Sequence, residues 1–336
     1  MSVTNDTIVL QCDTGSISLD DLSHQITPEW LTGALSQRSP GVAVEQASII
    51  KVFAGCSAKI WVRMRYNQVG VDSGLPDVMV VKAGFDRHDP IMLWTYQIEM
   101  QAYRDVLPRF AIHAPRCWYA GPSPDGASAA VIIEDLEPRG VRFCHALQPL
   151  SRDEATRFME AFAAFHAQSW QRPELTDGSW AWAIEQQETR AGLADYLGSL
   201  QAFESSQPQV VLMGDEHLGN LYIESDGTPG FLDFQSRVAP WAQGIAYFLG
   251  NALDALDRRA WERDLIAHYL DRLASRGVTP PGFDEAWDAY CRSLLFGFFV
   301  WLTNGTQFQT ESVCAANCAR YAAAVIDNQT FERLGA

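Results

Sequence analysis

The stretch Met213-Gly-Asp-Glu-His-Leu-Gly-Asn220 decides how this chain folds and what it is built for, together with the run Gly230-Phe-Leu-Asp-Phe-Gln235 that follows. The two segments place Asp215, Asn220 and Asp233 in the order Asp-x-x-x-x-Asn, strand, Asp-Phe. Two apolar runs separated by a polar turn are typical of a β-hairpin. Such a hairpin puts the amide just before one strand and the second carboxylate just after the other, so that both lie at the same end.

The predicted strands are Leu221–Ile223 and 230–232, with a turn at 225–228. In phosphoryl transfer from ATP, one carboxylate accepts the proton of the attacking hydroxyl, while an amide and a second carboxylate hold magnesium. The competing interpretation is a surface loop that contains acids and an asparagine by chance, because short motifs recur. The apolar strand before Asp-Phe and three features upstream make the chance interpretation less favourable.

The first upstream feature is the segment 52–62, which predicts a strand, a tight turn and a second strand. Gly55 in the turn would let backbone N–H groups approach phosphate oxygens closely, and Ser57 would add a hydroxyl donor. An ordinary hairpin turn is the alternative for this segment taken alone.

The second and third features are a lysine and a glutamate. The apolar run 77–83 predicts a buried strand, and Lys82 lies near its end. A helix is expected over about 91–106, with Glu99 facing inward. A buried lysine is costly unless it is paired. Glu99 would pair with Lys82 and aim its ammonium group at nucleotide phosphates. The alternatives are a lysine that extends to solvent and a solvated helical glutamate.

A continuous apolar strand, 129–136, ends in Glu134, Asp135 and Leu136. It suits a crossover between two lobes whose backbone would bind the edge of adenine. Glu134 and Leu136 mark the nucleotide-binding position here, and the acids are equally explained as the polar end of a core strand.

Taken in order, these features resemble the aminoglycoside phosphotransferase and choline kinase superfamily, and the endings at 134–136 and 233–235 look most like its ecdysteroid-kinase-like branch. The resemblance covers about residues 48–330. It implies an α+β, two-lobed protein-kinase-like fold, with a small antiparallel-sheet lobe and a larger helical lobe. We expect residues 1–136 to form the nucleotide-binding lobe and residues 137–336 the catalytic and acceptor lobe.

The resemblance also implies roles for individual residues. Asp215 would be the catalytic base, Asn220 and Asp233 the magnesium ligands, and Lys82 with Glu99 the pair that orients the phosphates. ATP and Mg²⁺ are the implied cofactors, and the acceptor would be a hydroxyl group of a small molecule. A protein kinase is disfavoured, because no Ala-Pro-Glu element follows the Asp-Phe strand.

The chain departs from the superfamily pattern at two positions. Met213 stands where the pattern usually has histidine, and Gly244 stands where it usually has an acid. Both usual residues support the catalytic loop, so their loss would loosen its geometry without removing a ligand. His217 is close enough in sequence to take over from the first, or it is a loop histidine without a chemical task. The departures motivate the alternative of a nucleotide-binding, pseudokinase-type regulator without turnover.

Composition sets further limits. The chain has 336 residues, of which 47% are hydrophobic and 11% aromatic, so it can form a sizeable core and is not globally disordered. A formal net charge of −16 disfavours nucleic acids and anionic membranes as partners. It is compatible with a neutral or cationic acceptor, and it leaves the oligomeric state open. The positive charge that neutralises the phosphates of ATP would have to come from Lys82, the backbone donors of the glycine turn and magnesium.

Other signals concern location and the acceptor. Seven scattered cysteines form no disulfide framework, and the amino terminus has no secretory signal, so we expect a cytoplasmic enzyme in a reducing compartment.

Residues 1–26 are expected to contain a short hairpin. Four helices are expected after the Asp-Phe strand, and their aromatic residues are explained either as core or as a wall of the acceptor pocket. Trp241 and Trp301 are the candidates for such a wall.

Overall fold

The computed structural model describes residues 2–11, 19–54, 57–85, 90–175, 177, 194–305 and 308–335. They divide into two compact units. The first comprises Met1–Pro108 and Pro115–Arg139, and the second comprises Arg109–Ala114 and Gly140–Ala336. The chain therefore passes into the second unit after Arg139, where the sequence places the boundary after residue 136, and the short segment from Arg109 to Ala114 goes with the second unit.

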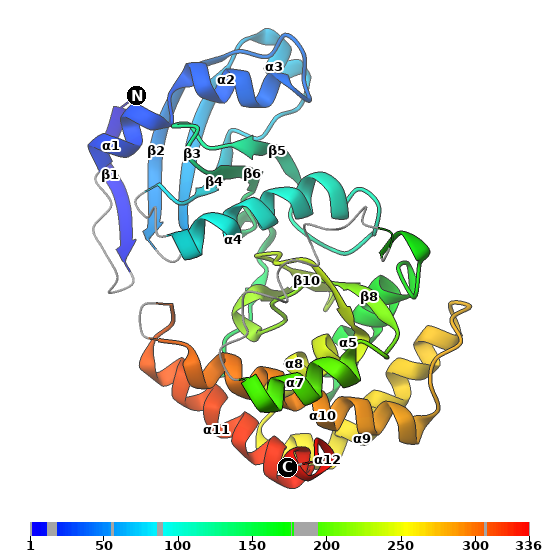
Figure 1. Ribbon diagram of the computed structural model, residues 1–336. Helices are drawn as coiled ribbons and strands as arrows, with labels where there is room; N and C mark the ends of the chain where they lie inside the picture. Colours follow the sequence, from blue (N-terminus) through cyan, green and yellow to red (C-terminus); the bar gives the residue numbers. More distant parts are fainter. Residues whose placement is uncertain are drawn as a thin grey trace. The chain divides into compact units, whose positions relative to one another are not determined.

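The first unit is built on a six-stranded sheet with the order β1-β2-β3-β4-β6-β5 (Figure 1). Its strands are β1 Ser2–Gln11, β2 Val44–Ala54, β3 Ala58–Tyr66, β4 Val78–Ala83, β5 Cys117–Pro122 and β6 Ala129–Glu134. The predicted strands on either side of residue 55 are confirmed as β2 and β3, which pair antiparallel.

The expected hairpin within residues 1–26 is wrong. Strand β1 pairs with β2 in parallel, and the other pairs of this sheet are antiparallel. Parallel neighbours need a crossover connection rather than a tight turn. Here the chain between the two strands includes helices α1 (Leu19–Gln25) and α2 (Pro28–Ser36).

The core of the first unit explains the orientation of β4. Met79, Val81 and Ala83 belong to one buried cluster that also contains Leu31 and Leu35 of α2. Since side chains alternate along a strand, Lys82 points to the other face. That face carries helix α4 (Pro90–Gln101), which packs on β6 and continues as one π-helical turn, Ala102–Val106. Figure 1 shows α2 and α4 on opposite sides of the sheet.

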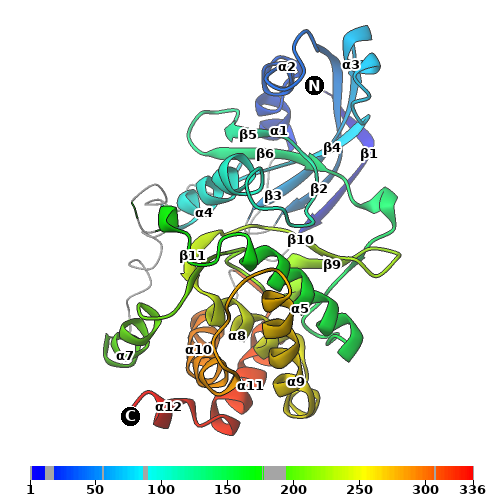
Figure 2. The ribbon, with the colours of Figure 1, turned by 90° about the vertical axis from the view of Figure 1, so that its right-hand side faces the viewer.

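The second unit combines two small sheets with a set of helices (Figure 2). Strands β9 (Leu221–Ile223) and β10 (Pro229–Phe231) form the predicted hairpin, which β7 (Arg142–Phe143) extends. Strand β8 (Gln209–Leu212) pairs with β11 (Arg237–Pro240). The longer helices are α5 Arg152–Ala167, α7 Ala194–Glu204, α8 Trp241–Ala252, α9 Ala255–Ala274, α10 Phe283–Thr303 and α11 Glu311–Asp327.

The remaining elements are short. They are the helices α3 Gln68–Asp72 and α12 Thr330–Arg333, and the 3₁₀ turns Glu137–Arg139, Pro173–Leu175 and Leu218–Asn220. Helix α10 begins at the predicted Phe283, whereas α9 begins at Ala255 rather than at the predicted Ala260. Ser151 and Glu154 form the capping box at the start of α5. Helix α8 is buried along its whole length, as expected for a helix whose residues are mostly apolar.

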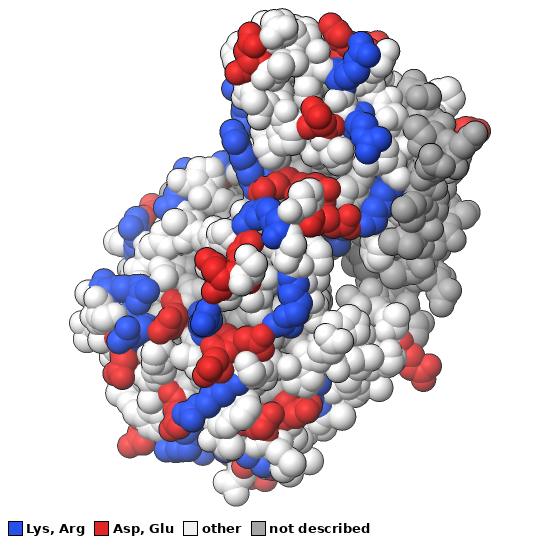
Figure 3. Space-filling view, turned by 180° about the vertical axis from the view of Figure 1, so that it is seen from behind, with Lys and Arg blue, Asp and Glu red and all other residues white. Residues whose placement is uncertain are grey.

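The predicted α+β class, with an antiparallel-sheet lobe and a helical lobe, is confirmed by these two units. Among the described residues, no helix combines the length and the apolar character that a bilayer span requires. Acidic and basic side chains are interspersed on the described part of the face in Figure 3 rather than gathered by sign.

Candidate active site

The loop that carries Asp215 begins with a turn that only glycine can make. Gly214 follows the buried Met213 and has a φ of +98°. A Cβ built on Gly214 would lie 1.7 Å from the carbonyl oxygen of Gln235, so the two backbones are in close contact. The sharp turn directs the next side chain, that of Asp215, away from strand β8.

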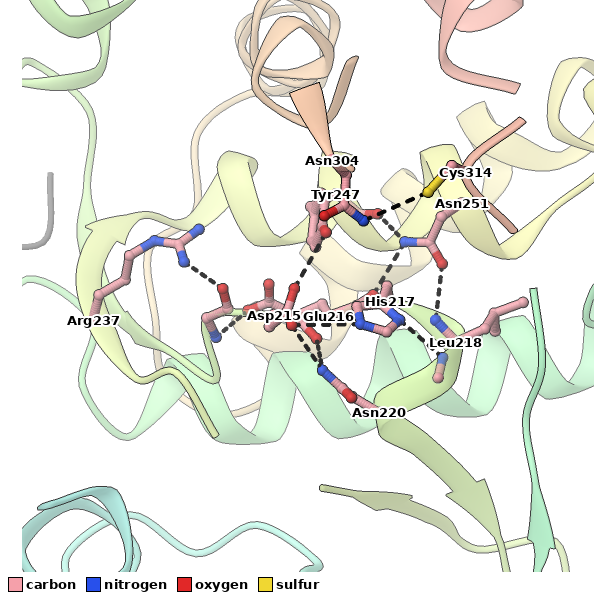
Figure 4. A network of polar contacts seen from close by, with 12 residues as sticks. Asp215, Glu216, His217, Leu218, Asn220, Arg237, Tyr247, Asn251, Asn304 and Cys314 are labelled. Atoms are coloured by element: carbon pink, nitrogen blue, oxygen red, sulfur yellow. Dashed lines mark hydrogen bonds and ion pairs between the residues drawn. The ribbon is translucent and has the colours of Figure 1, made fainter. Parts of the chain in front are cut away.

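Three side chains surround the Asp215 carboxylate (Figure 4). Asn220 donates from Nδ2 to Oδ2 of Asp215 at 2.9 Å and to its backbone oxygen at 3.0 Å. Tyr247 on α8 donates its hydroxyl to Oδ1 at 3.2 Å. The Asp215 side chain is nevertheless 34% exposed. The carboxylate is therefore held in one orientation and is still accessible to a ligand.

His217 is the third neighbour. Its Nδ1 accepts the backbone N–H of Gly219 at 3.0 Å, and its Nε2 lies 3.4 Å from Oδ2 of Asp215. Burial alone would lower the pKa of His217, but the carboxylates of Asp215 and Asp233 outweigh burial and raise it. His217 is thus in contact with the candidate base.

Asp233 lies close to Asn220 because of the hairpin. The N–H of Leu232 donates to the carbonyl oxygen of Asn220 at 2.8 Å, which brings the residue after β10 to the residue before β9. Asp233 has a φ of +53°, in the left-handed region that aspartate and asparagine tolerate better than most residues. The three predicted residues therefore converge within the second unit.

The donor set fits magnesium. Asn220 uses its Nδ2 toward Asp215, which leaves its amide oxygen for a cation, and Asp233 supplies a carboxylate. Mg²⁺ prefers oxygen ligands and is often held by one or two carboxylates with the substrate's phosphates. A group of three His, Cys, Asp or Glu side chains that could hold a metal ion is not found among the described residues.

The predicted ion pair of the first unit is present. Lys82 Nζ lies 2.7 Å from Glu99 Oε1, and the two side chains are 4% and 6% exposed. Glu99 lies on α4 near Tyr96, which is also buried. Burial of both charges together is the arrangement that makes a lysine inside a lobe tolerable. Its action on phosphates stays a prediction.

The remaining nucleotide-site predictions are placed as follows. Glu134 ends β6, where its carboxylate pairs with Arg139 at 3.2 Å and its N–H bonds the carbonyl of Arg116 at 2.9 Å. Leu136 follows and is buried. Ser57 is half-buried and precedes β3, whereas Gly55 lies outside the described residues.

The two candidate acceptor tryptophans differ. Trp241 is fully buried and stacks on Tyr269, with ring centroids 5.4 Å apart, so its indole packs in the core of the second unit. Trp301 is also buried, but its ring meets that of His217 edge to face at 5.4 Å. Trp301 therefore lies next to the loop that carries Asp215, whereas the ring contacts of Trp241 are with Trp170 and Tyr269.

Sequence reasoning missed several residues that build this site. Tyr247, Glu216, Arg237 and Asn251 contact the loop from within and from α8 and β11 (Figure 4). Asn251 accepts the N–H of Leu218 at 3.0 Å and thereby ties the loop to α8. The available signal was the presence of charged and amide residues in segments that are otherwise apolar.

Comparisons with known proteins give a family match for part of the chain and similar folds for most of it. Residues 78–181 match the model of the ecdysteroid kinase-like family. The fold is similar to that of a protein from Ralstonia eutropha JMP134 named as an aminoglycoside phosphotransferase, with a TM-score of 0.54, 15% identity and coverage of 90% of this chain and 98% of that one. No curated protein matches the chain in sequence.

Two further structures are similar. Choline kinase from Cryptosporidium parvum Iowa II has a TM-score of 0.51 and 11% identity, with 91% of this chain and 98% of that chain covered. Ethanolamine kinase from Plasmodium vivax has a TM-score of 0.50 and 11% identity, with 83% and 81% covered. The resemblance to the aminoglycoside phosphotransferase and choline kinase superfamily is confirmed, and the fold is the protein-kinase-like fold of these phosphotransferases.

Proposed function

From the protein-kinase-like fold and the ecdysteroid kinase-like match over residues 78–181, we propose that this protein is a small-molecule kinase. It transfers the γ-phosphoryl group of Mg-ATP to a hydroxyl group of its acceptor. The observation that carries the proposal is the convergence of Asp215, Asn220 and Asp233 at one end of the β9–β10 hairpin. These are the base and the metal ligands that phosphoryl transfer requires.

The chemistry at Asp215 follows from its contacts. Asn220 and Tyr247 fix the carboxylate in one orientation, and its partial exposure leaves room for an acceptor hydroxyl. The carboxylate takes the proton of that hydroxyl while a bond forms between the hydroxyl oxygen and the γ-phosphorus. The bond between this phosphorus and the β–γ bridging oxygen breaks, and ADP leaves with the bridging oxygen.

Charge neutralisation is the second requirement. Asn220 and Asp233 would hold magnesium, and the ion supplies positive charge to the phosphate oxygens when bound. In the first unit, Glu99 holds the Lys82 ammonium in a defined place for the same purpose. A protein of net charge −16 needs such local sources of positive charge to bind a triphosphate.

The test is a transfer assay with γ-labelled ATP, Mg²⁺ and a panel of alcohols, sugars, amino alcohols and aminoglycosides, extended to metabolite extracts. Label should appear in an acceptor with the wild-type protein and far more slowly with Asp215→Asn. Nucleotide binding is measured in parallel by the shift in unfolding temperature. If the protein binds Mg-ATP but neither hydrolyses it nor transfers phosphate to any acceptor, the kinase proposal is rejected in favour of a nucleotide-binding regulator.

A further inference from the structure

Two charged side chains, Glu216 and Arg237, hold the backbone of Gly214, the residue directly before Asp215. Figure 4 shows Glu216 and Arg237 on either side of this turn. Glu216 accepts the Gly214 N–H through Oε1 at 2.8 Å, and Arg237 donates from Nη1 to the Gly214 carbonyl oxygen. Glu216 is completely buried and Arg237 is 5% exposed. Both polar groups of one glycine are therefore bonded to buried side chains of opposite charge.

Gly214 cannot be held in another way. Its left-handed backbone and its close approach to Gln235 leave no room for a side chain, so any support for this turn must act on its peptide groups. Asp215 follows immediately, and a rotation of the turn would displace the carboxylate. The bonds to Gly214 thus hold the backbone from which the Asp215 side chain extends, while Asn220 and Tyr247 hold its carboxylate.

Arg237 is itself anchored. Its Nε and Nη2 donate to Oε1 of Gln243 at 3.1 and 2.9 Å, and its guanidinium lies 5.0 Å from the ring centroid of Phe296. Gln243 in turn donates to Glu204 of α7 at 3.0 Å. Strand β11 also holds Arg237 opposite Leu212 of β8. A guanidinium with this many fixed partners can position a backbone carbonyl.

The neighbourhood of Gly244 accounts for the loss of the superfamily's acid. A Cβ at residue 244 would lie 2.9 Å from Cδ2 of Leu212 and 3.3 Å from Oε1 of Glu216. An acid at 244 would therefore enter the space of the Glu216 carboxylate, and two buried like charges in contact are unfavourable. Met213, at the other departure, is fully buried as an apolar residue. We therefore consider the departures at residues 213 and 244 together with the presence of a carboxylate at residue 216.

We propose that Glu216 and Arg237 are the positioning pair of the catalytic loop, acting through Gly214 in place of the histidine and acid that Met213 and Gly244 replace. This proposal rests on the proposed kinase function. Burying two charged side chains is costly and adds little stability compared with well-packed apolar residues, so their presence in the core is better explained by the geometry that they impose on Gly214. Burial raises the pKa of Glu216, and the charge of Arg237 partly opposes this shift. The raised pKa reflects the free-energy cost of keeping the charged carboxylate out of water.

The experiment exchanges the position of the carboxylate. Glu216→Ala removes it, Gly244→Asp adds a second one, and the double variant moves one carboxylate from residue 216 to residue 244. Because the Cβ at 244 would be 3.3 Å from Oε1 of Glu216, an aspartate there reaches the place of that oxygen. Glu216→Gln keeps the acceptor for Gly214 without the charge. Glu262→Gln, in the buried Arg258–Glu262 pair of α9, is the matched control.

We expect Glu216→Ala and Gly244→Asp each to lower kcat, on the order of a hundredfold for the alanine variant, with little change in the KM for ATP. The double variant should be faster than either single variant, and Glu216→Gln should lose less than Glu216→Ala. Glu262→Gln should leave kcat unchanged. A wild-type kcat in Glu216→Ala, or a double variant slower than both singles, would overturn the proposal.

A second readout does not depend on turnover. Hydrogen exchange of the backbone amides in residues 213–220 should accelerate in Glu216→Ala, slow again in the double variant, and stay unchanged in Glu262→Gln. If the wild-type protein transfers phosphate to no acceptor, the kinase proposal fails and this exchange series alone decides whether the pair holds the loop. Equal exchange in Glu216→Ala and the wild type would then reject it.

Discussion

Lys82 and Glu99 form a buried ion pair, with Nζ and Oε1 2.7 Å apart on β4 and α4. The pair links the sheet of the first unit to its helix. Because both charges are removed from water, the loss of one leaves the other uncompensated, which is more harmful than the loss of both.

We predict that Lys82→Met destabilises the protein by about 3 kcal/mol or more, because Glu99 stays buried without its cation. The double variant Lys82→Met/Glu99→Leu should regain most of the stability and none of the transferase activity. Urea unfolding and the transfer assay on the same samples separate the two effects. Recovery of activity in the double variant would remove Lys82 from the nucleotide site.

Asp215→Asn should reduce kcat by about 10² to 10⁴, because an amide cannot take the acceptor's proton. ATP binding should be retained. Tyr247→Phe is the matched variant, since it removes only the hydroxyl that donates to Oδ1 of Asp215 and keeps the ring. We expect a smaller loss of kcat from it. A wild-type rate in Asp215→Asn would exclude Asp215 as the base.

Asp233→Asn should abolish metal-dependent transfer, and added Mg²⁺ should not restore it. Asparagine tolerates the left-handed backbone at this position, so the variant should fold. Asp226→Asn, in the turn of the same hairpin, is the control, because an amide oxygen can still accept the N–H of Thr228. A magnesium titration of turnover in both variants checks the assignment, and wild-type turnover in Asp233→Asn would contradict it.

Glu204 should make stability fall as the pH rises toward neutrality. Burial raises its pKa to about 7, against the partly opposing effects of Gln243 and Arg237. The folded state therefore retains this proton up to about pH 7, while the unfolded chain releases it above its ordinary value of 4.5. The contribution of the protonated group is complete below that value and is lost by the time the pH passes the folded pKa.

The measurement is urea unfolding of the wild type and Glu204→Gln between pH 4 and 8. The variant, which carries no charge, should gain stability relative to the wild type by up to about 1.4 kcal/mol per pH unit within this window. A difference between the two proteins that is independent of pH would contradict the prediction.

Gly214→Ala should destabilise the protein by more than about 3 kcal/mol, since the added methyl group meets the Gln235 carbonyl at 1.7 Å and the backbone is left-handed. Gly33→Ala is the matched control. It lies in α2 with open space around it, and it should stabilise the protein by about 0.5–1 kcal/mol. Thermal unfolding of both variants tests the contrast, and a Gly214→Ala variant as stable as the wild type would show that the turn can shift.

Several parts of the fold could be predicted because their signals are local. The β9–β10 hairpin follows from two apolar runs around a polar turn, and the start of α5 follows from the Ser151–Glu154 capping box. The parallel pairing of β1 with β2 could not, because their contact spans residues far apart in the chain. Local periodicity does not specify the partner of a strand.

The predicted residues at 215, 220 and 233 were recognisable because their order along the chain reflects a hairpin that brings them together. Trp241 shows the limit of this reasoning. Aromatic residues at helical spacing look alike in sequence, and only packing shows that Trp241 stacks on Tyr269 while Trp301 lies against His217.

By itself, the sequence determined the β9–β10 hairpin and the placement of Asp215, Asn220 and Asp233 around it, because both depend on residues that are neighbours along one short stretch of chain. Only the tertiary structure decided what supports them. Arg237 lies on β11, Gly244 lies on α8 and Glu216 lies in the loop after β8. Packing of these elements brings Arg237 to Gly214 and Gly244 to Glu216. A buried carboxylate can exclude a second one only where folding has brought the two positions into contact.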